Sequence, residues 1–267
     1  RFDHFVITVH KCDLRVNLHT EPIIERFKPD TIIHLAAMAG VRDSLGKEKS
    51  YHANNIDATQ NLIDACKIHV PDVHVVYAST SCVYAGSQVP WTEGNETGKQ
   101  LNAYGYTKWA NECQFHSSQL SNTGLRFFTV YGPWGRPDMA LFDFTKNILA
   151  DQPITVYNYG DMKRDFTYVD DILDGIEVVL KHRESIDNNE IFNIGRGKQV
   201  QLMDFITEIE NNTGKQAIKN LAPKHPAGTL ETWANTSKLE ALGYKRKKDA
   251  RVGIAKCYHW YQECTGV

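Results

Sequence analysis

The sequence predicts an α/β fold in which a doubly wound parallel β-sheet carries helices on both faces. Two observations favour this fold class. Short β-branched runs alternate with longer segments of 3.6-residue hydrophobic periodicity, which is typical of parallel strands joined by helical crossovers. At 267 residues and 42% hydrophobic, the chain can also bury one large core, or a large and a small one. In open sheets of this kind, ligands bind beyond the carboxyl ends of the strands.

Each element is predicted from its own pattern. Val, Ile, Thr and Phe crowd the short runs, and such residues suit a strand. The longer segments space apolar residues three and four apart, which gives a helix one apolar face. The predicted strands cover 5–9, 31–36, 73–78 and 125–130, and the predicted helices cover 22–27, 51–69, 102–121, 139–150 and 249–263. Beyond residue 151 glycine, proline and turns become more frequent, which indicates a smaller and less regular lobe.

Composition excludes several classes of function. The net charge of −2 and pI near 6.6 predict neither a nucleic-acid partner nor a membrane surface, and no apolar run is long enough to span a bilayer. The six cysteines contain no Cys-x-x-Cys pair and no signal peptide precedes them, so we expect reduced thiols in a cytoplasmic protein. The eleven histidines lack ligand spacing, and we expect no metal site.

Tyr104 and Lys108 carry the chemistry that the sequence indicates. Residues four apart on a helix lie about 5–6 Å apart at Cβ, so the ammonium should sit beside the phenol and lower its pKa. A tyrosine that acts as a base at neutral pH needs about 4 kcal/mol of help. One cation at about 4 Å supplies approximately that at an effective dielectric of 20.

The same spacing occurs twice more, at Tyr159/Lys163 and at Tyr244/Lys248. Neither of these pairs follows a strand that ends in hydroxyl groups. Tyr159 stands in a turn signal, and Lys248 closes a basic run. We therefore interpret both pairs as solvated surface charge.

The ends of two predicted strands carry residues that could take part in this chemistry. At the end of the second predicted strand, after Leu35, the small residues Ala36, Ala37, Ala39 and Gly40 would let a flat cofactor lie against the backbone; a tight turn is the alternative. The third predicted strand ends in the polar cluster Ser79, Thr80, Ser81 and Cys82. A helix cap or a hydroxyl turn is the alternative to a catalytic role for that cluster.

Over essentially its whole length, the chain resembles the extended short-chain dehydrogenase/reductases that rework nucleotide sugars, and above all the UDP-glucuronate 4-epimerases. The Tyr/Lys pair is generic to this superfamily, whereas the string from 126 to 139 is narrow. The segments that carry the resemblance are 34–41, 80–84, 104–108, 126–139, 163–168 and 230–234. The resemblance implies a Rossmann-like NAD-binding domain over 1–135, to which 165–195 returns, and a mainly substrate-binding lobe over 136–267.

The resemblance also assigns roles, for NAD as a bound cofactor and a UDP-sugar as substrate. Tyr104 would take the proton of the sugar 4-hydroxyl, Thr80 would hydrogen-bond that hydroxyl, and Lys108 would bind the nicotinamide ribose. The implied cofactor contacts are Asp13, Leu14, Leu35, Ala36, Ala37, Ser79, Tyr104 and Lys108, and the implied substrate contacts are Ser81, Cys82, Thr129, Arg136 and Arg164.

Two positions favour epimerisation of a uronic acid. Similar dehydratases and decarboxylases carry an acidic residue where Cys82 stands, so dehydration is disfavoured. The planar fork of Arg136 suits a C6 carboxylate, and a structural salt bridge is its alternative. A UDP-hexose 4-epimerase, a UDP-glucuronate decarboxylase and a non-catalytic UDP-sugar-binding remnant stay open as other functions.

Two departures from the family pattern bear on binding. The chain opens at what should be the third strand of the nucleotide-binding fold, without the glycine-rich phosphate loop, so we expect it to be N-terminally incomplete. Gly228 stands where related enzymes often place a ribose-binding Asp. Helices like those predicted at 51–69 and 102–121 form two-fold interfaces in similar proteins, which implies a homodimer.

Overall fold

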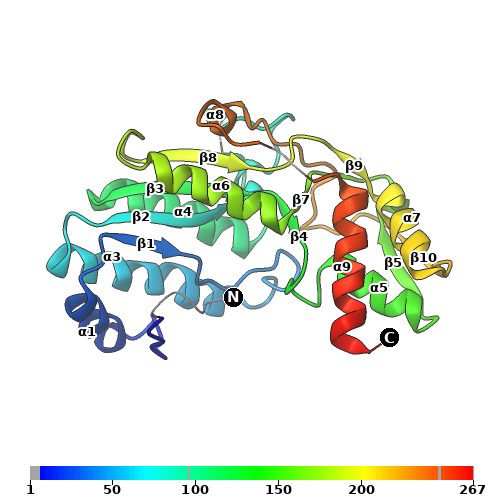
Figure 1. Ribbon diagram of the computed structural model, residues 1–267, viewed down its shortest axis with the longest axis horizontal. Helices are drawn as coiled ribbons and strands as arrows, with labels where there is room; N and C mark the ends of the chain where they lie inside the picture. The colour runs from blue at the N-terminus through cyan, green and yellow to red at the C-terminus, as the bar shows by residue number, and fades with distance from the viewer. Residues whose placement is uncertain (1–6, 96, 246–247, 267) are drawn as a thin grey trace.

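The structure is a computed structural model that describes residues 7–95, 97–245 and 248–266. Among these residues, the larger part of the molecule is built on a four-stranded parallel sheet with strand order β1-β2-β3-β8 (Figure 1). The strands of this sheet are β1 (Thr31–His34), β2 (His74–Thr80), β3 (Ser121–Phe127) and β8 (Glu190–Ile194). The doubly wound α/β prediction is confirmed.

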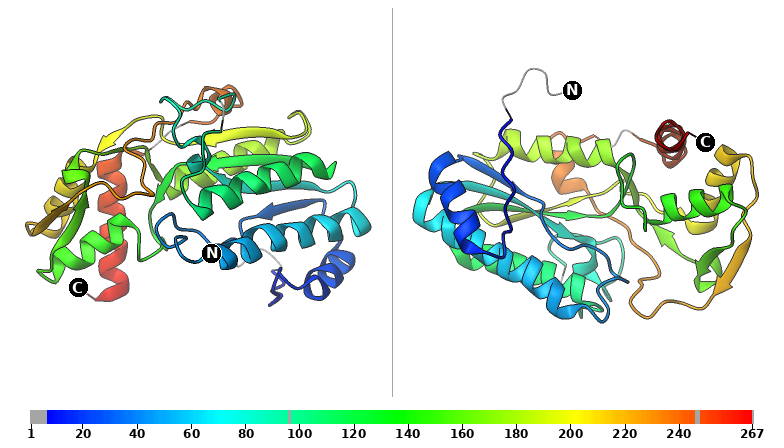
Figure 2. Two further views of the ribbon diagram at one scale, coloured as in Figure 1. Left: turned by 180° about the vertical axis from the view of Figure 1, so that it is seen from behind. Right: turned by 90° about the horizontal axis from the view of Figure 1, so that it is seen from below.

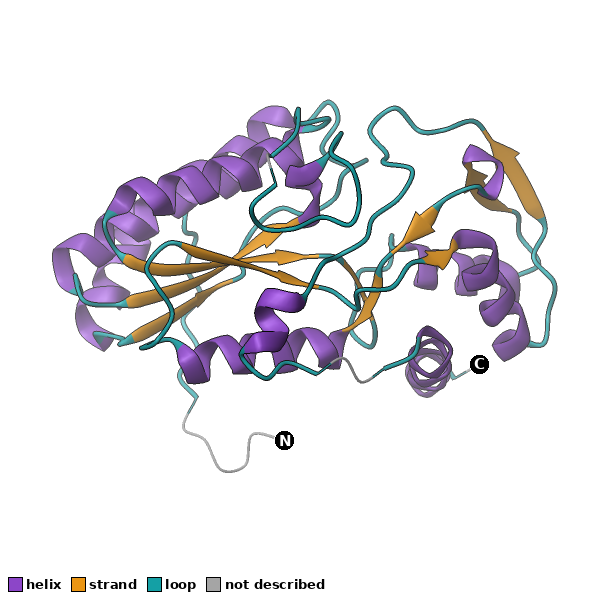
Figure 3. Ribbon diagram, turned by 90° about the horizontal axis from the view of Figure 1, so that it is seen from above, coloured by secondary structure: helices purple, strands orange, loops and turns teal. Residues whose placement is uncertain are grey.

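Helices cover both faces of the sheet (Figure 3). Successive side chains of a strand point to opposite faces, so on β2 Val75 and Tyr77 enter one core cluster while Val76 enters another. The first cluster is closed by α1 (Asn17–Phe27), α3 (Ala58–His69) and α4 (Ala103–Ser118), and the second by α6 (Val169–His182) and α8 (Ser237–Ala241).

A smaller, less regular part packs around a third cluster, where Phe166 stacks on Phe205 with ring centroids 3.9 Å apart. Figure 2 shows α9 running beside α7 in this part. Its elements are β4 (Thr129–Tyr131), α5 (Ala140–Leu149), β5 (Ile154–Tyr157), η3 (Asn158–Gly160), β6 (Lys163–Arg164), β7 (Phe166–Tyr168), β9 (Val200–Gln201), α7 (Leu202–Thr213), β10 (Lys219–Ala222) and α9 (Ala250–Thr265). Three short strand pairs, β4 with β7, β6 with β9 and β5 with β10, hold it together among the described residues.

The strand predicted at 5–9 is wrong for its described residues. Residues 7–9 form no strand, and Val9 is 85% exposed, whereas residues 5 and 6 lie outside the described ranges. A β-branched run makes a strand only where a neighbouring strand offers backbone partners, and β1 pairs with β2 alone among the described residues.

The helix predicted at 51–69 is interrupted. It runs as α2 (Glu48–Tyr51), the π-helical turn η1 (His52–Asp57) and α3. Asn55 within η1 is buried, and its side chain accepts a hydrogen bond from Met38 N (2.7 Å) and donates to Met38 O (3.0 Å) and Thr107 Oγ1 (2.9 Å). The irregular turn therefore ties the loop after β1 to α4.

Two further observations concern other kinds of site. None of the helices in the described ranges combines the length and apolar character that a membrane span requires. Within the same ranges, His, Cys, Asp and Glu side chains nowhere gather in the groups of three that could hold a metal ion. All six cysteines lie in the described ranges and are free thiols.

Candidate active site

The end of β2 and the start of α4 place the predicted catalytic residues. Thr80 ends β2, and its hydroxyl caps the short helix η2 (Ser81–Tyr84) by accepting from the backbone N–H of Cys82 (3.2 Å). Asn102 caps α4 by accepting from Gly105 N (2.8 Å). The caps fix both turns and bring Tyr104, on the first turn of α4, close enough to Thr80 for the Thr80 hydroxyl to lower the pKa of the phenol.

The pKa of Tyr104 moves opposite to the predicted direction. Burial raises it, and the neighbouring Cys82 thiol raises it further, whereas the hydrogen bond with Thr80 and the charge of Arg136 lower it. Lys108 is not the dominant cation at the phenol. The spacing of Tyr104 and Lys108 indicates a nearby charge but carries no information on the loss of solvation, which here is the larger effect.

Lys108 lies one turn further into the protein and is 3% exposed. Its ammonium donates to the carbonyl of Ala78 on β2 (2.8 Å). Burial lowers the pKa of Lys108 to about 8, against the opposing charge of Glu112. A carbonyl carries no charge, so this ammonium keeps donors for a further acceptor at the end of the sheet.

A cavity of about 420 Å³ opens beside the end of β2 and the start of α4, where Ser81, Cys82 and Asn102 line it, and its other walls come from the smaller part. All five predicted substrate residues line it: Ser81, Cys82, Thr129, Arg136 and Arg164. They come from the β2 end, from β4, from the turn after β4 and from β6. The structure thus brings together residues that are up to 83 positions apart, from 81 to 164, in the chain.

Arg164 is held in the cavity wall by backbone carbonyls. Its guanidinium donates to the carbonyls of Lys163 (2.8 Å), Leu230 (2.8 Å) and Thr229 (2.5 Å). Burial lowers the pKa of Arg164 to about 10, which leaves it charged at neutral pH. Neutral partners fix the direction of this cation without cancelling its charge, as a binding site for an anion requires.

Arg136 pairs with Asp138 within one wall of the same cavity. Its Nε donates to Asp138 Oδ1 (2.9 Å), and its Nη2 forms a second, short contact with Asp138 Oδ2. Both residues line the cavity. The salt bridge that was the alternative reading of Arg136 is therefore present, inside the predicted substrate site.

Five of the predicted cofactor residues, Asp13, Leu14, Leu35, Ala36 and Ala37, lie outside this cavity. The Asp13 carboxylate makes a bidentate pair with Arg15 (2.6–3.1 Å), which holds the pKa of Asp13 at about 2. The carbonyl of Leu14 accepts from Asn61 (2.9 Å). Leu35, Ala36 and Ala37 are exposed beyond the carboxyl end of β1.

These residues fit a dinucleotide. The exposed small side chains after β1 leave an open floor beside the sheet, and the ammonium of Lys108 has donors to spare at its end. Asp13 and Leu14 lie in the turn just before α1, and the carbonyl of Leu14 is tied to α3 by Asn61. Asp13 and Leu14 can therefore border the adenosine of a dinucleotide, and Lys108 can border its nicotinamide ribose.

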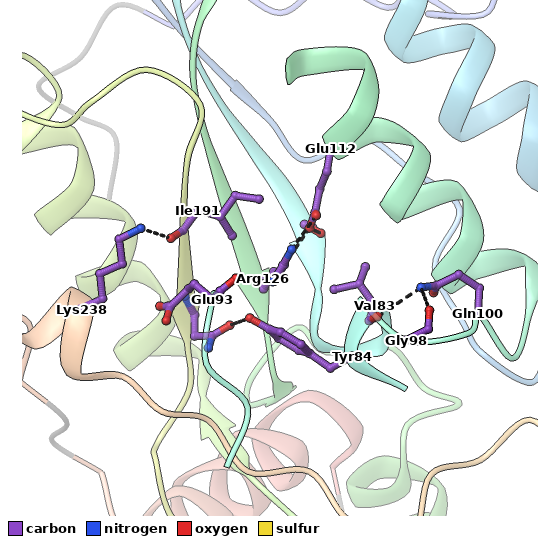
Figure 4. A network of polar contacts seen from close by, with 11 residues as sticks. Val83, Tyr84, Glu93, Gly98, Gln100, Glu112, Arg126, Ile191 and Lys238 are labelled. Carbon is purple, nitrogen blue, oxygen red and sulfur yellow. Dashed lines mark hydrogen bonds and ion pairs between the residues drawn. The ribbon is translucent and has the colours of Figure 1, made fainter. Parts of the chain in front are cut away.

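Sequence reasoning missed a buried polar network behind the site (Figure 4). Glu112 on α4 holds Arg126 of β3 in a bidentate ion pair (2.9 and 2.8 Å) and accepts from Ser79 Oγ (2.5 Å). The guanidinium of Arg126 also lies 4.5 Å from the ring centre of Tyr84. An arginine inside an apolar strand and a glutamate one turn after Lys108 were the available signals. Ser79 therefore turns toward this network.

The two other Tyr/Lys pairs differ from each other. Tyr159 is 65% exposed, which confirms the surface interpretation for this residue. Tyr244 is 2% exposed and donates to the carbonyl of Gly195 (3.2 Å), so the surface interpretation was wrong there. Tyr244 packs in the core between the sheet and α6. The basic run that follows it in the sequence, part of which lies outside the described residues, suggested a surface position instead.

Comparison with known proteins adds the context of this geometry. Residues 2–195 match the NAD dependent epimerase/dehydratase family. A probable UDP-glucuronate 4-epimerase of Rhizobium meliloti (strain 1021) is 37% identical over 90% of this chain and 76% of that protein. The UDP-glucuronic acid 4-epimerase from Bacillus cereus, solved with UDP-glucuronic acid and NAD, superposes with a TM-score of 0.84 at 35% identity, over 93% of this chain and 80% of that one.

A third similar protein, MoeE5, has been solved with two ligands. Its complex with UDP-glucuronic acid and NAD superposes with a TM-score of 0.87 and its complex with UDP-glucose and NAD with 0.88, both at 29% identity over 96% of this chain and 85% of that one. An acidic and a neutral sugar nucleotide thus both bind one protein of this shape.

Proposed function

Since the chain belongs to the NAD dependent epimerase/dehydratase family, we propose that it inverts C4 of a UDP-sugar with NAD as bound cofactor, and that its substrate is UDP-glucuronate, which becomes UDP-galacturonate. The observation that carries this proposal is one cavity that joins Ser81, Cys82 and Asn102, which lie next to Thr80 and Tyr104 in the chain, to two arginines. An acidic nucleotide sugar has two anionic groups, the diphosphate and the C6 carboxylate, to match them.

Tyr104 and Thr80 handle the proton of the reaction. Tyr104 takes the proton of the sugar 4-hydroxyl when C4 is oxidised and returns it when C4 is reduced, and Thr80 hydrogen-bonds the same oxygen. NAD, when bound along Asp13, Leu14, the 35–37 segment and Lys108, supplies the oxidation and the later reduction. Because burial raises the pKa of Tyr104 in the protein alone, bound ligands must supply the remaining stabilisation of the phenolate.

Arg164 and Arg136 select the substrate in this proposal. Arg164 is fixed by three carbonyls and retains its charge for the diphosphate. Arg136 offers the planar fork that fits a carboxylate. Ser81, Cys82 and Thr129 would border the sugar between the two cations, and Gly228 in the same cavity leaves the nucleotide ribose without a carboxylate partner at that point.

The division of labour follows the two cores. We propose that residues 1–135 together with 165–195 hold the cofactor, since β8 pairs with β3 in the main sheet, and that most of 136–267 shapes the substrate site. The free thiols support a reducing, cytoplasmic location.

A homodimer belongs to the same proposal. The outer face of α4 exposes Tyr106 and Trp109, by 44% and 38%, although large aromatic side chains are normally buried or partnered. A second copy related by a two-fold axis would cover that face. Analytical sedimentation tests the homodimer. A dimeric parent and a monomeric Trp109→Glu variant would support it, whereas a monomeric parent would contradict it.

The test of the reaction follows the C4 proton of UDP-glucuronate by NMR in the presence of NAD. We expect a galacturonate signal, and Tyr104→Phe should reduce its rate by at least about a hundredfold, the usual range for losing an acid–base group. Tyr159→Phe is the matched control, because it changes an exposed tyrosine with the same spacing to a lysine. Equal rates for both variants, or no galacturonate at all, would reject the assignment.

A UDP-hexose 4-epimerase is the second candidate, supported by the complex of MoeE5 with UDP-glucose. The same NMR assay with UDP-glucose decides between the two. Turnover of UDP-glucose without turnover of UDP-glucuronate would identify a UDP-hexose 4-epimerase. Release of CO₂ from UDP-glucuronate would indicate a decarboxylase instead.

A further inference from the structure

Asp138 occupies one edge of the Arg136 guanidinium. Arg136 uses its Nε and Nη2, one complete edge of the guanidinium, on the Asp138 carboxylate. A two-point contact between that edge and a carboxylate is also the way in which an arginine binds a ligand carboxylate. Only Pro137 separates the two residues in the chain, so the pair forms within one short turn of the cavity wall.

Neighbouring residues hold the Arg136 guanidinium in place, whereas the Asp138 carboxylate is free to move away from it. A Cβ built on Gly40, whose φ is +130°, would lie 2.9 Å from Nη2 of Arg136, so the loop after β1 closes tightly on the arginine. The Asp138 side chain is 57% exposed and can turn into water at small cost. Arg42, on the same cavity wall, also acts on the Asp138 carboxylate and helps to lower its pKa.

We propose that Asp138 is a specificity-determining residue that occupies the carboxylate-binding edge of Arg136 until the uronate of a substrate displaces it. This inference rests on the proposed function. With a neutral sugar in the cavity, Asp138 stays on Arg136 and the cation remains neutralised. With an acidic sugar, the substrate carboxylate replaces Asp138, and the energy of the internal pair is subtracted from the affinity.

The test measures binding, by calorimetry, of UDP-glucuronate and of UDP-glucose to the protein loaded with NAD. A Tyr104→Phe background keeps each ligand unconverted during the titration. Asp138→Asn should tighten UDP-glucuronate about three- to fivefold, the equivalent of one exposed ion pair, and change UDP-glucose less than twofold. The neutral sugar controls for the diphosphate, which both ligands share.

Two further variants separate a local effect from a general one. Asp143→Asn removes the same charge from the same cavity wall, but Asp143 accepts from Asn147 (3.2 Å) and not from Arg136, so it should leave both affinities within twofold. In an Arg136→Ala protein, Asp138→Asn should lose its effect on UDP-glucuronate, because no edge is left to release.

Several results would overturn the proposal. Unchanged or weaker binding of UDP-glucuronate to Asp138→Asn would show that Asp138 positions Arg136 and does not compete for it. An equal gain for UDP-glucose, or an equal gain in Asp143→Asn, would reduce the effect to overall charge. Failure of the proposed reaction would appear separately, as an absent NMR signal for galacturonate in the parent, and would leave the calorimetric comparison interpretable.

Discussion

Lys108 keeps a positive charge inside the protein, next to the carbonyl of Ala78. Its pKa in the folded state is about 8, below the ordinary 10.5, so between these values the unfolded chain binds more protons than the folded one. Stability therefore rises with pH across this window, and Lys108 adds no pH dependence below it. Against Lys108→Met, the free energy of unfolding should rise by about 2–3 kcal/mol from pH 7 to pH 10.

Urea unfolding at several pH values measures this difference. The buried tyrosines titrate above this window in both proteins and cancel in the comparison. Parallel stability curves for the parent and Lys108→Met would mean that the ammonium is better solvated than its position indicates.

Glu112 compensates a second buried cation, Arg126, and removal of the carboxylate charge would leave that cation alone. Glu112→Gln should lower the free energy of unfolding by about 3–5 kcal/mol, as for other broken buried pairs. Asp43→Asn breaks the exposed pair with Lys47 (2.6 Å) and should cost less than about 1 kcal/mol. Similar losses for the two variants in urea would contradict a structural role for the buried network.

At the active site, residue types and spacing predicted which side chains lie close together, but they did not predict the pKa values of those side chains. Thr80 and Tyr104 do meet, because strand ends and helix starts converge at one edge of a parallel sheet. The pKa of Tyr104 was predicted in the wrong direction, because burial raises it and burial depends on neighbours from distant segments, such as Tyr51, whose ring centre lies 6.4 Å from that of Tyr104. The partner of Arg136 could be found only in three dimensions, since Asp138 could equally have faced water.

The start of α4 sets the position of Tyr104, and one cap holds that start. Asn102→Ala removes the acceptor for Gly105 N and should destabilise the protein by about 1 kcal/mol. Because Tyr104 lies in the same turn, the rate of C4 inversion should fall as well. Asn102→Asp keeps the acceptor and is the control; urea unfolding and the NMR assay compare all three proteins. An unchanged rate in Asn102→Ala would show that packing alone fixes the turn.

Element prediction succeeded where burial follows a simple period and failed where polar groups are buried. The run predicted at 73–78 continues as β2 through Ser79 and Thr80, whose hydroxyl groups find partners in the interior. The π-helical turn around Asn55 has no signature in hydrophobic spacing, because it depends on side-chain hydrogen bonds to Met38 and α4.

Asp165 connects distant parts of the whole molecule. Its buried carboxylate accepts from the backbone N–H groups of Arg196 (2.8 Å), Gly197 (2.9 Å) and Ala234 (3.0 Å). Burial raises the pKa of Asp165, and these N–H groups oppose that rise. Asp165→Asn places an amide group against N–H donors and should lower the free energy of unfolding by about 2–4 kcal/mol.

Hydrogen exchange locates the effect of that substitution. The amides of Gly197 and Ala234 should exchange faster in Asp165→Asn, while those of β2 keep their relative protection. The control is Asp161→Asn, which changes an exposed carboxylate near the same strand. Uniformly faster exchange would indicate general destabilisation without a local link. The sequence shows Asp165 only as one residue of 163–168, because its three backbone N–H partners come from two other segments.

The cavity takes its walls from separate stretches of chain: one side comes from 40–43, from the turn after β2 and from the residues just before α4, and the opposite side from the turn after β4, from β6 and from 225–232. The two sides rest on different hydrophobic clusters. Selectivity can therefore be re-engineered by transplanting the second set of segments, since such a graft leaves the reactive apparatus and the parallel sheet beneath it untouched.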